Sequence, residues 1–137
     1  MDGDEAQITA LLYRLARCFD HRSWDQVGDV MDADVHAYGC QGRDAVVADS
    51  LRRHLGGCGP SQHLLGNPVV EVAGDRATSL TYARVFHQGA DELADRSFEC
   101  LGEYHDTWVR RAQGWRMVGR VFEVAVTLGD PAVLRPG

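Results

Sequence analysis

The sequence predicts an α+β fold in which three N-terminal helices pack against a strongly curved antiparallel sheet. Two observations predict this class. Apolar residues recur at helical spacing near the N-terminus, and residues 103–126 alternate with a period of two on both sides of a turn. Helices laid against a curved sheet form a cone, and the open end between the two layers is a natural ligand cavity.

Length and composition point to one globular domain. With 137 residues, of which 45% are hydrophobic, the chain can bury a substantial core. We expect a single domain over residues 1–137, with a core at about residues 5–128 and a tail at 129–137. No segment resembles a signal peptide or a membrane span, so we expect a soluble, cytoplasmic protein.

The charge of the chain narrows the class of partner. Its formal net charge is −6, whereas nucleic acids and anionic membranes are bound by basic surfaces. We therefore expect no nucleic-acid or membrane partner, and instead a small-molecule substrate that is apolar or cyclic. All 14 basic residues are arginine, which excludes Schiff-base chemistry on a lysine.

Neither the cysteines nor the isolated histidines form a metal or redox motif. The four cysteines lie far apart, without a C-x-x-C pair: Cys18, Cys40, Cys58 and Cys100. We interpret them as free, mostly buried thiols. His21, His36 and His54 have no H-x-H or i,i+4 partner, and the chain contains no Gly-rich phosphate loop. We therefore expect neither a metal nor a cofactor.

Three segments in the first half of the chain are predicted to be helical. The first runs from about Glu5 to His21 with Asp4 as its N-cap, and its core stripe consists of Ile8, Leu11, Leu12, Leu15 and Phe19. A short second helix opens at Ser23 and is broken by Asp32-Ala33-Asp34. The third helix spans Gly42 to Leu55.

The remainder is predicted to form strands, as their alternation and turn residues indicate. The expected strands are 35–40, 62–72, 77–87, one that begins at Arg96, and 115–126. Gly74-Asp75 and Ala112-Gln113-Gly114 supply the turns. After Gly129 the tail is expected to be a frayed end or a lid.

Three segments resemble a known family in their order and separation. They are ITALLYRLARCFDHRSWDQVGDVMDADV, SQHLLGN and GEYHDTWVRRAQGWRMVGR. Together they resemble the SnoaL-like branch of the nuclear transport factor 2-like superfamily, over about residues 5–128. This resemblance implies the cone fold. It defines the activity poorly, because the superfamily includes dehydratases, dehydrochlorinases, isomerases, cyclases, epoxide hydrolases and non-catalytic modules.

Asp20 is the first candidate for chemistry. It lies on the edge of the apolar stripe, and Tyr13 projects from nearly the same side with only Ala16 between them, which leaves room for a ligand. The helix dipole disfavours a negative charge in the last turn, so we expect a raised pKa for this carboxyl. From the helix alone, a solvated helix-end aspartate explains Asp20 better.

His63 changes this interpretation through the family resemblance. Dehydratase and dehydrochlorinase members pair an aspartate of the first helix with a histidine, and Asp20 and His63 match both places. The carboxylate would fix the imidazole tautomer, leaving the other ring nitrogen to take a proton next to a leaving group. Considered alone, His63 is equally consistent with a histidine satisfied by backbone at a strand start.

Further polar residues are candidate substrate-binding groups. Tyr13 or Tyr38 would hydrogen-bond a substrate carbonyl or departing hydroxyl. His87 resembles the second histidine of fungal scytalone dehydratases, or else sits at an exposed strand end. Arg120 would contact a substrate oxygen, or else form an ion pair with Glu123 or Asp106.

The resulting prediction is a cofactor-independent lyase of the dehydratase type, with Asp20 and His63 as the catalytic pair. The alternatives are a polyketide-type cyclase or isomerase and a non-catalytic ligand-binding or dimerisation module. Cyclases of the SnoaL type use a strand aspartate as acid and base, and Asp106 can fill that place. Ketosteroid isomerases carry their base on the first strand, where Tyr38-Gly39 stands instead. We also expect a homodimer, since an exposed sheet face usually finds a partner.

Overall fold

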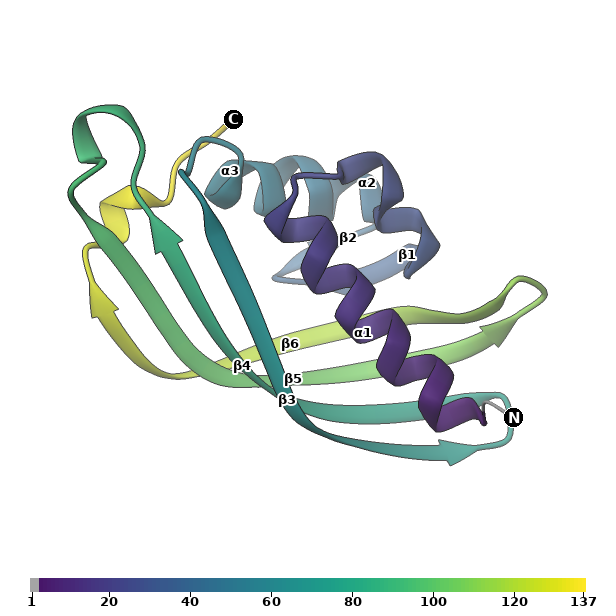
Figure 1. The fold of residues 1–137 in the computed structure, drawn as a ribbon. Coiled ribbons are helices and arrows are strands. Elements are labelled where there is room, and N and C mark those ends of the chain that lie inside the picture. Colours follow the sequence, from purple (N-terminus) through teal and green to yellow (C-terminus); the bar gives the residue numbers. More distant parts are fainter. Residues whose placement is uncertain (1–2) are drawn as a thin grey trace.

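A computed structural model describes residues 3–137 (Figure 1). The helical elements are α1 (Asp4–Asp20), η1 (Trp24–Asp29), α2 (Arg43–Ala45), η2 (Val46–Leu51), α3 (Arg52–Leu55), η3 (Asp91–Leu93) and η4 (Pro131–Val133). The strands are β1 (Met31–Ala37), β2 (Cys40–Gln41), β3 (Ser61–Ala73), β4 (Arg76–Gln88), β5 (Ser97–Arg111) and β6 (Gly114–Gly129). This is the α+β class that the sequence predicts.

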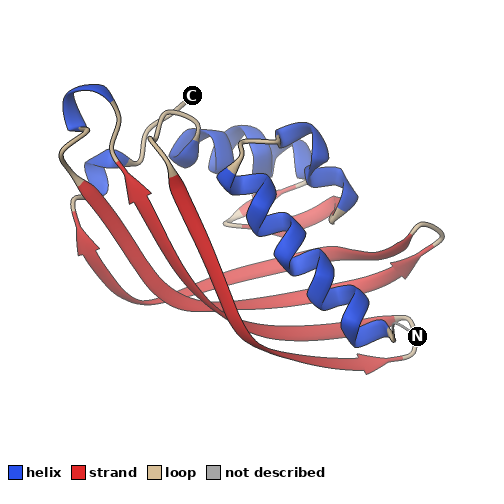
Figure 2. Ribbon diagram, viewed as in Figure 1, coloured by secondary structure: helices blue, strands red, loops and turns tan. Residues whose placement is uncertain are grey.

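The strands form one six-stranded sheet in the order β2-β1-β6-β5-β4-β3. The four long strands form an antiparallel meander and bend strongly, and α1 lies across their concave side (Figures 1 and 2). The prediction of a purely antiparallel sheet is wrong, because β1 pairs with β6 in parallel. Alternation along a strand identifies its two faces but carries no information about the direction of its neighbour.

The predicted helices agree with the structure best at the N-terminus. α1 matches its predicted bounds to within a residue at each end. The second helix is only the 3₁₀ segment η1, and the strand after it begins at Met31, earlier than predicted. Met31, predicted as the last inward residue of that helix, is instead the first buried residue of this strand, and the expected break at Asp32-Ala33-Asp34 lies within the strand. The third helix is one helical run, Arg43 to Leu55, whose middle part η2 is π-helical.

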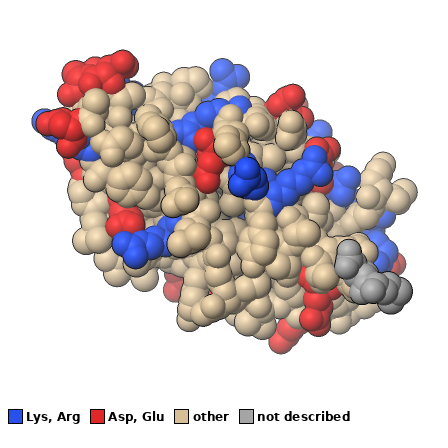
Figure 3. All heavy atoms as spheres, in the orientation of Figure 1, with Lys and Arg blue, Asp and Glu red and all other residues tan. Residues whose placement is uncertain are grey.

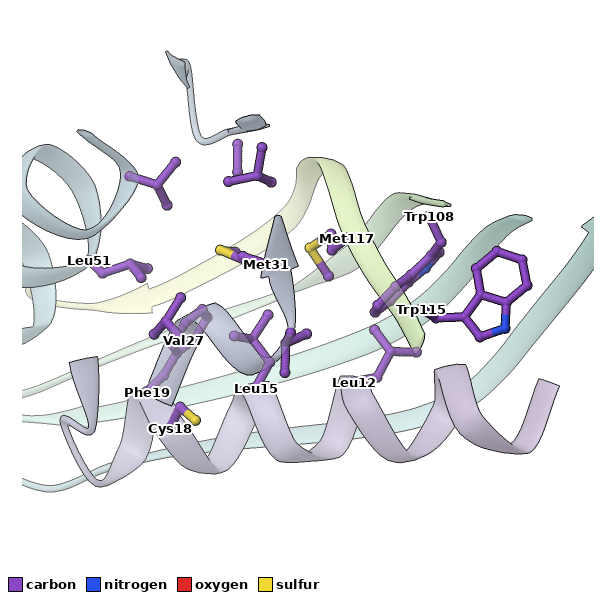
Figure 4. Packing of buried hydrophobic residues seen from close by; sticks show 14 of the residues in the cluster. Leu12, Leu15, Cys18, Phe19, Val27, Met31, Leu51, Trp108, Trp115 and Met117 are labelled. Atoms are coloured by element: carbon purple, nitrogen blue, oxygen red, sulfur yellow. The ribbon is translucent and has the colours of Figure 1, made fainter. Parts of the chain in front are cut away.

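The core fills the space between α1 and the sheet (Figure 4). The predicted stripe supplies one side of it, and Ile8, Leu12, Leu15 and Phe19 are almost fully buried. The opposing side chains come from η1 and from β1, β5 and β6: Val27, Met31, Trp108, Trp115 and Met117. Burial of these large apolar surfaces is the main force that holds α1 on the sheet.

Asp4 does not cap α1 as predicted. The N-cap residue is Gly3, and Asp4 lies in the first turn. Its carboxylate accepts hydrogen bonds from Arg110 Nη1 at 2.8 Å, Arg110 Nη2 at 2.9 Å and Trp115 Nε1 at 3.0 Å. These bonds connect the start of α1 to the β5–β6 hairpin. The hydrogen bonds from Arg110 and Trp115 lower the pKa of Asp4 to about 2.

Replacing Asp4 by asparagine is therefore expected to destabilise the protein in a pH-dependent manner. Because the folded pKa lies below the ordinary value of 3.8, the contribution is complete above about pH 4 and fades as the pH falls towards 2. Urea unfolding at steps from pH 7 to pH 3 measures the difference from wild type. The matched control is Asp75→Asn, whose carboxylate is 85% exposed on the same Arg110 and should matter little. A difference between Asp4→Asn and wild type that stays constant over this range would contradict the assignment.

The C-terminal segment is ordered against the helical layer (Figure 1). Val133 is fully buried, Gly57 N donates to Arg135 O at 2.9 Å, and Gly137 N donates to Arg52 O at 3.1 Å. Of the two expectations for the tail, a frayed end is therefore wrong. Among residues 3–137, no helix has the length and apolar character needed to cross a membrane. On the face shown in Figure 3, acidic and basic side chains are interspersed.

Candidate active site

A cavity of about 280 Å³ lies between the helical layer and the concave side of the sheet. Its walls are mostly apolar, and its polar groups include three histidines and two tyrosines. The lining residues are Phe19, Tyr38, Ser50, Leu51, His54, Leu55, His63, Val85, His87, Cys100, Tyr104, Phe122, Val124 and Leu134. A larger hollow of about 680 Å³ lies on the outer side of the sheet, but no predicted site residue lines it. Another hollow, of about 610 Å³, includes Asp106 and Arg120 in its wall but neither His63 nor His87. We take the 280 Å³ cavity as the candidate site because His63, His87 and Tyr38 line it together.

Asp20 is in contact with His63, and His63 lines this cavity. Asp20 is the last residue of α1, and His63 lies near the start of β3. His63 Nδ1 is 2.6 Å from Asp20 Oδ1, and the backbone N–H of His63 donates to both carboxylate oxygens at 3.0 and 3.1 Å. The side chain of His63 is 6% exposed and that of Asp20 is 17% exposed. The pair is shielded from bulk water, and the imidazole faces the cavity.

The pKa of Asp20 departs from its ordinary value in the direction opposite to our expectation. Burial raises it, but the hydrogen bonds from the side chain and backbone of His63 and from Ser61 together outweigh burial, so the pKa is lowered. The helix dipole that suggested a raised value is a weaker influence than these direct bonds. Asp20 is therefore a firmly ionised partner for the imidazole.

His87 stands beside His63 on the adjacent strand. The two rings meet edge to face with centroids 6.3 Å apart, and His87 Nδ1 is 2.9 Å from Phe98 O. Since a carbonyl can only accept, this nitrogen carries the hydrogen. Burial lowers the pKa of His87, which keeps the ring neutral. Its Nε2 can therefore only accept a hydrogen bond from a molecule in the cavity.

Tyr38 is the predicted tyrosine that reaches the cavity. Its hydroxyl accepts from Arg120 Nη1 at 3.2 Å, and the pKa of nearby Tyr104 is raised mainly by burial. Because an arginine can only donate, the Tyr38 oxygen is the acceptor in this contact, and its hydrogen can be donated to a molecule in the cavity. The backbone of Tyr38 has a φ of 53°, which lies in the left-handed region that residues other than glycine rarely adopt.

Arg120 and Asp106 form a buried ion pair behind this wall. Arg120 Nε and Nη2 donate to the two oxygens of Asp106 at 2.7 and 2.9 Å, and the residues are only 4% and 2% exposed. The guanidinium also lies 3.6 Å from the ring centre of Tyr104. Neither Arg120 nor Asp106 lines the cavity. Of the two interpretations of Arg120, the structure therefore favours the ion pair with Asp106.

The structure does not bring Tyr13 to this group. Its side chain is 42% exposed on α1, and it is absent from the cavity wall. Seven residues separate it from Asp20, which is about 10 Å along a helix. A shared helix face therefore does not place both side chains at the same end of the cavity.

Two residues near the pair were not predicted. Ser61 Oγ donates to Asp20 Oδ1 at 3.2 Å, and Arg22 Nη1 donates to Ser61 Oγ at 2.7 Å. The alternation of β3 contains a signal for Ser61, because it lies two residues before His63 and so on the same face. No sequence pattern indicates Arg22.

No cluster of three His, Cys, Asp or Glu side chains suited to a metal occurs within residues 3–137. The four cysteines are free; Cys18 and Cys100 are buried, while Cys40 and Cys58 are partly so. Cys100 lies on the cavity wall, where burial raises the pKa of its thiol. The expectation of cofactor-free chemistry stays a prediction.

The fold is shared with several solved structures. The Kfla4162 protein from Kribbella flavida has a TM-score of 0.86 and 23% identity, with 95% of both chains covered. A candidate scytalone dehydratase from Novosphingobium aromaticivorans has a TM-score of 0.76 and 17% identity, covering 88% of this chain and 83% of that one. Hexachlorocyclohexane dehydrochlorinase LinA-type3 from Novosphingobium barchaimii has a TM-score of 0.72 and 14% identity, covering 89% and 86%. At these identities the likeness shows the nuclear transport factor 2-like fold alone.

Sequence comparison identifies the family. The uncharacterized protein Rv2910c of Mycobacterium tuberculosis is 30% identical over 124 residues, which cover 87% of this chain and 84% of that protein. The SnoaL-like domain matches residues 3–121, most of the chain. The chain therefore belongs to the SnoaL-like domain family.

Proposed function

We propose that the protein is a small-molecule lyase that eliminates water from its substrate without a cofactor. The observation that carries this proposal is the 2.6 Å contact between Asp20 and His63 at the wall of a mostly apolar cavity. The carboxylate holds Nδ1, so Nε2 points the opposite way and is the nitrogen left for a substrate. An incidental structural pair would have no need of an open cavity in front of the ring.

The geometry supports an elimination in which His63 acts as base. Nε2 takes a proton from a carbon next to a carbonyl, and the electrons of that C–H bond form the new double bond. The C–O bond to the departing hydroxyl breaks, and this oxygen takes the proton back from His63 and leaves as water. Asp20 stabilises the imidazolium between these steps. Tyr38 donates its hydroxyl hydrogen to the carbonyl oxygen, where negative charge develops.

The cavity limits the substrate in size and in polarity. About 280 Å³ is just below the roughly 300–1,000 Å³ of typical ligand sites, so we propose a compact molecule of one or two rings. His87 offers an acceptor and Tyr38 a donor. A matching substrate therefore carries a hydroxyl that can donate to His87 and a carbonyl that can accept from Tyr38. The solved relatives named for dehydration and dehydrochlorination also suggest elimination as the reaction class.

The buried ion pair argues against the cyclase alternative. A general acid or base has to exchange protons with a substrate, but both oxygens of Asp106 are held by Arg120 outside the cavity wall. An acid–base role for Asp106 would require the pair to open. Elimination by His63 requires no such change.

Turnover by variants of the pair tests these roles. A panel of cyclic β-hydroxy ketones, followed by the absorbance of the conjugated product, supplies the assay. If Asp20 holds Nδ1 and Nε2 takes the proton, His63→Ala and Asp20→Asn should each lose most of the wild-type rate on a substrate of this panel. Full activity in either variant would sink the assignment.

We further propose that the outer side of the sheet binds a second copy of the chain. Large apolar side chains are exposed there on β3, β4 and β6: Leu64, Leu80, Tyr82, Phe86, Val121 and Val126. Sedimentation equilibrium is expected to give a dimer for the wild type and a monomer for Tyr82→Glu. Tyr13→Glu, on the exposed face of α1, should leave the dimer intact. A wild-type monomer at all concentrations would refute the proposal.

A further inference from the structure

Arg22 occupies a backbone position that usually belongs to glycine. It follows α1 with a φ of 55°, in the left-handed region. Its N–H donates to Phe19 O at 3.2 Å, and the N–H of Ser23 donates to Cys18 O at 2.9 Å. These two bonds form the Schellman motif that closes a helix. Glycine is common at this point because it has no Cβ to clash, so an arginine here calls for a physical reason.

The contacts of the Arg22 side chain supply that reason. Its Nη1 donates to Phe19 O at 2.8 Å, and its Nη2 donates to Gly59 O at 2.8 Å. Nη1 also donates to Ser61 Oγ at 2.7 Å. One half-buried guanidinium therefore joins the end of α1 to the loop before β3 and to β3 itself. A glycine would close the helix equally well but would make none of these connections.

Ser61 extends this connection to the catalytic pair. Its hydroxyl accepts from Arg22, so its hydrogen is free to be donated to Asp20 Oδ1, 3.2 Å away. The same oxygen lies 2.6 Å from His63 Nδ1. Because Ser61 and the backbone N–H of His63 hold the carboxylate together, it cannot turn away from the imidazole without losing several hydrogen bonds.

We propose that Arg22 and Ser61 are positioning residues that keep the Asp20 carboxylate aimed at His63, and that an arginine occupies the left-handed position for this purpose. Neither residue lines the cavity, so both act through Asp20. Their effect on rate rests on the proposed function. Their effect on the orientation of the pair does not, and a spectroscopic measurement can follow it without a substrate.

Arg22→Gly separates positioning from stability. The variant loses the hydrogen bonds of the guanidinium but relieves the strain of a side chain at a left-handed position; since these effects oppose one another, its Tm is expected to stay near that of the wild type. The Nδ1–H proton of His63, observed by ¹H–¹⁵N NMR, should be protected from water in the wild type and lost to exchange in the variant. Asn67→Gly is the matched control, since Asn67 is exposed with a φ of 51° and should keep the signal.

Ser61→Ala provides a second test that leaves the backbone unchanged. It is expected to weaken the same Nδ1–H signal. With a substrate from the ketone panel, each variant should lower kcat/KM by about 10–100-fold, mainly through kcat, and the double variant little further. If Arg22→Gly does not fold, Ser61→Ala decides the question.

An unchanged Nδ1–H signal in both variants would overturn the positioning role and reduce Arg22 to a helix-end contact. This outcome is distinct from failure of the proposed function, which would show as undiminished activity in His63→Ala. The NMR result stands in either case, because it reports the geometry of the pair and not turnover.

Discussion

Replacing His63 by alanine is expected to lower kcat/KM by about 10²–10⁴-fold, the range typical of a lost general base. The imidazole is the group placed between the carboxylate of Asp20 and the cavity, and no other side chain in the described structure pairs with Asp20 in the same way. Asp20→Asn is expected to cause a loss of similar order. The amide cannot stabilise the imidazolium, and it can hold the ring in the wrong tautomer.

The double variant is the sharper measurement. Residues that act as one unit are not additive, so the combined replacement should cost little more than His63→Ala alone. His36→Ala, an exposed histidine on β1, is the matched control and should retain full activity. Losses that multiply would argue against a shared role, and near wild-type activity in both single variants would remove the basis for the lyase proposal.

Breaking the buried pair of Arg120 and Asp106 is expected to have the largest effect on stability. Arg120→Met leaves a carboxylate that is 2% exposed without its partner, and such a loss costs about 3–5 kcal/mol. Burial by itself would lower the pKa of Arg120, but Asp106 outweighs it, and the pKa is raised well above its ordinary value. Neither charge would therefore be stable at its buried position without the other.

Replacing both charges together provides the test of this reasoning. Arg120→Met combined with Asp106→Leu is expected to be markedly more stable than Arg120→Met alone, because no uncompensated charge remains. Urea unfolding measures all three proteins. The pair of Arg84 and Glu99 is the control, since Arg84 is 60% exposed and Arg84→Met should lower the free energy of unfolding only slightly. If Arg120→Met and Arg84→Met lowered the free energy of unfolding by the same amount, burial would have no special role.

The resemblance that the sequence suggested is confirmed by the family match, whereas the catalytic roles remain proposals. Among the candidate site residues, His63, Tyr38 and His87 line one cavity, and Asp20 contacts His63. Tyr13 lies outside this cavity because it is seven residues before Asp20, about 10 Å along α1, even though both residues project from nearly the same side of the helix. Arg120 and Asp106 form an ion pair with each other. The sequence left this possibility open because the alternation along β5 does not tell which of its faces points inward.

The sequence by itself determined the elements whose signal is local. The apolar stripe of α1 and the alternation of the four long strands are periodic patterns that a single segment must satisfy to bury one face. Only the tertiary structure decided what depends on contacts between distant segments. These are the parallel pairing of β1 with β6, the link from Asp4 to the β5–β6 hairpin, and the chain from Arg22 through Ser61 to Asp20. Such contacts are set by how whole elements pack, and no local pattern records them.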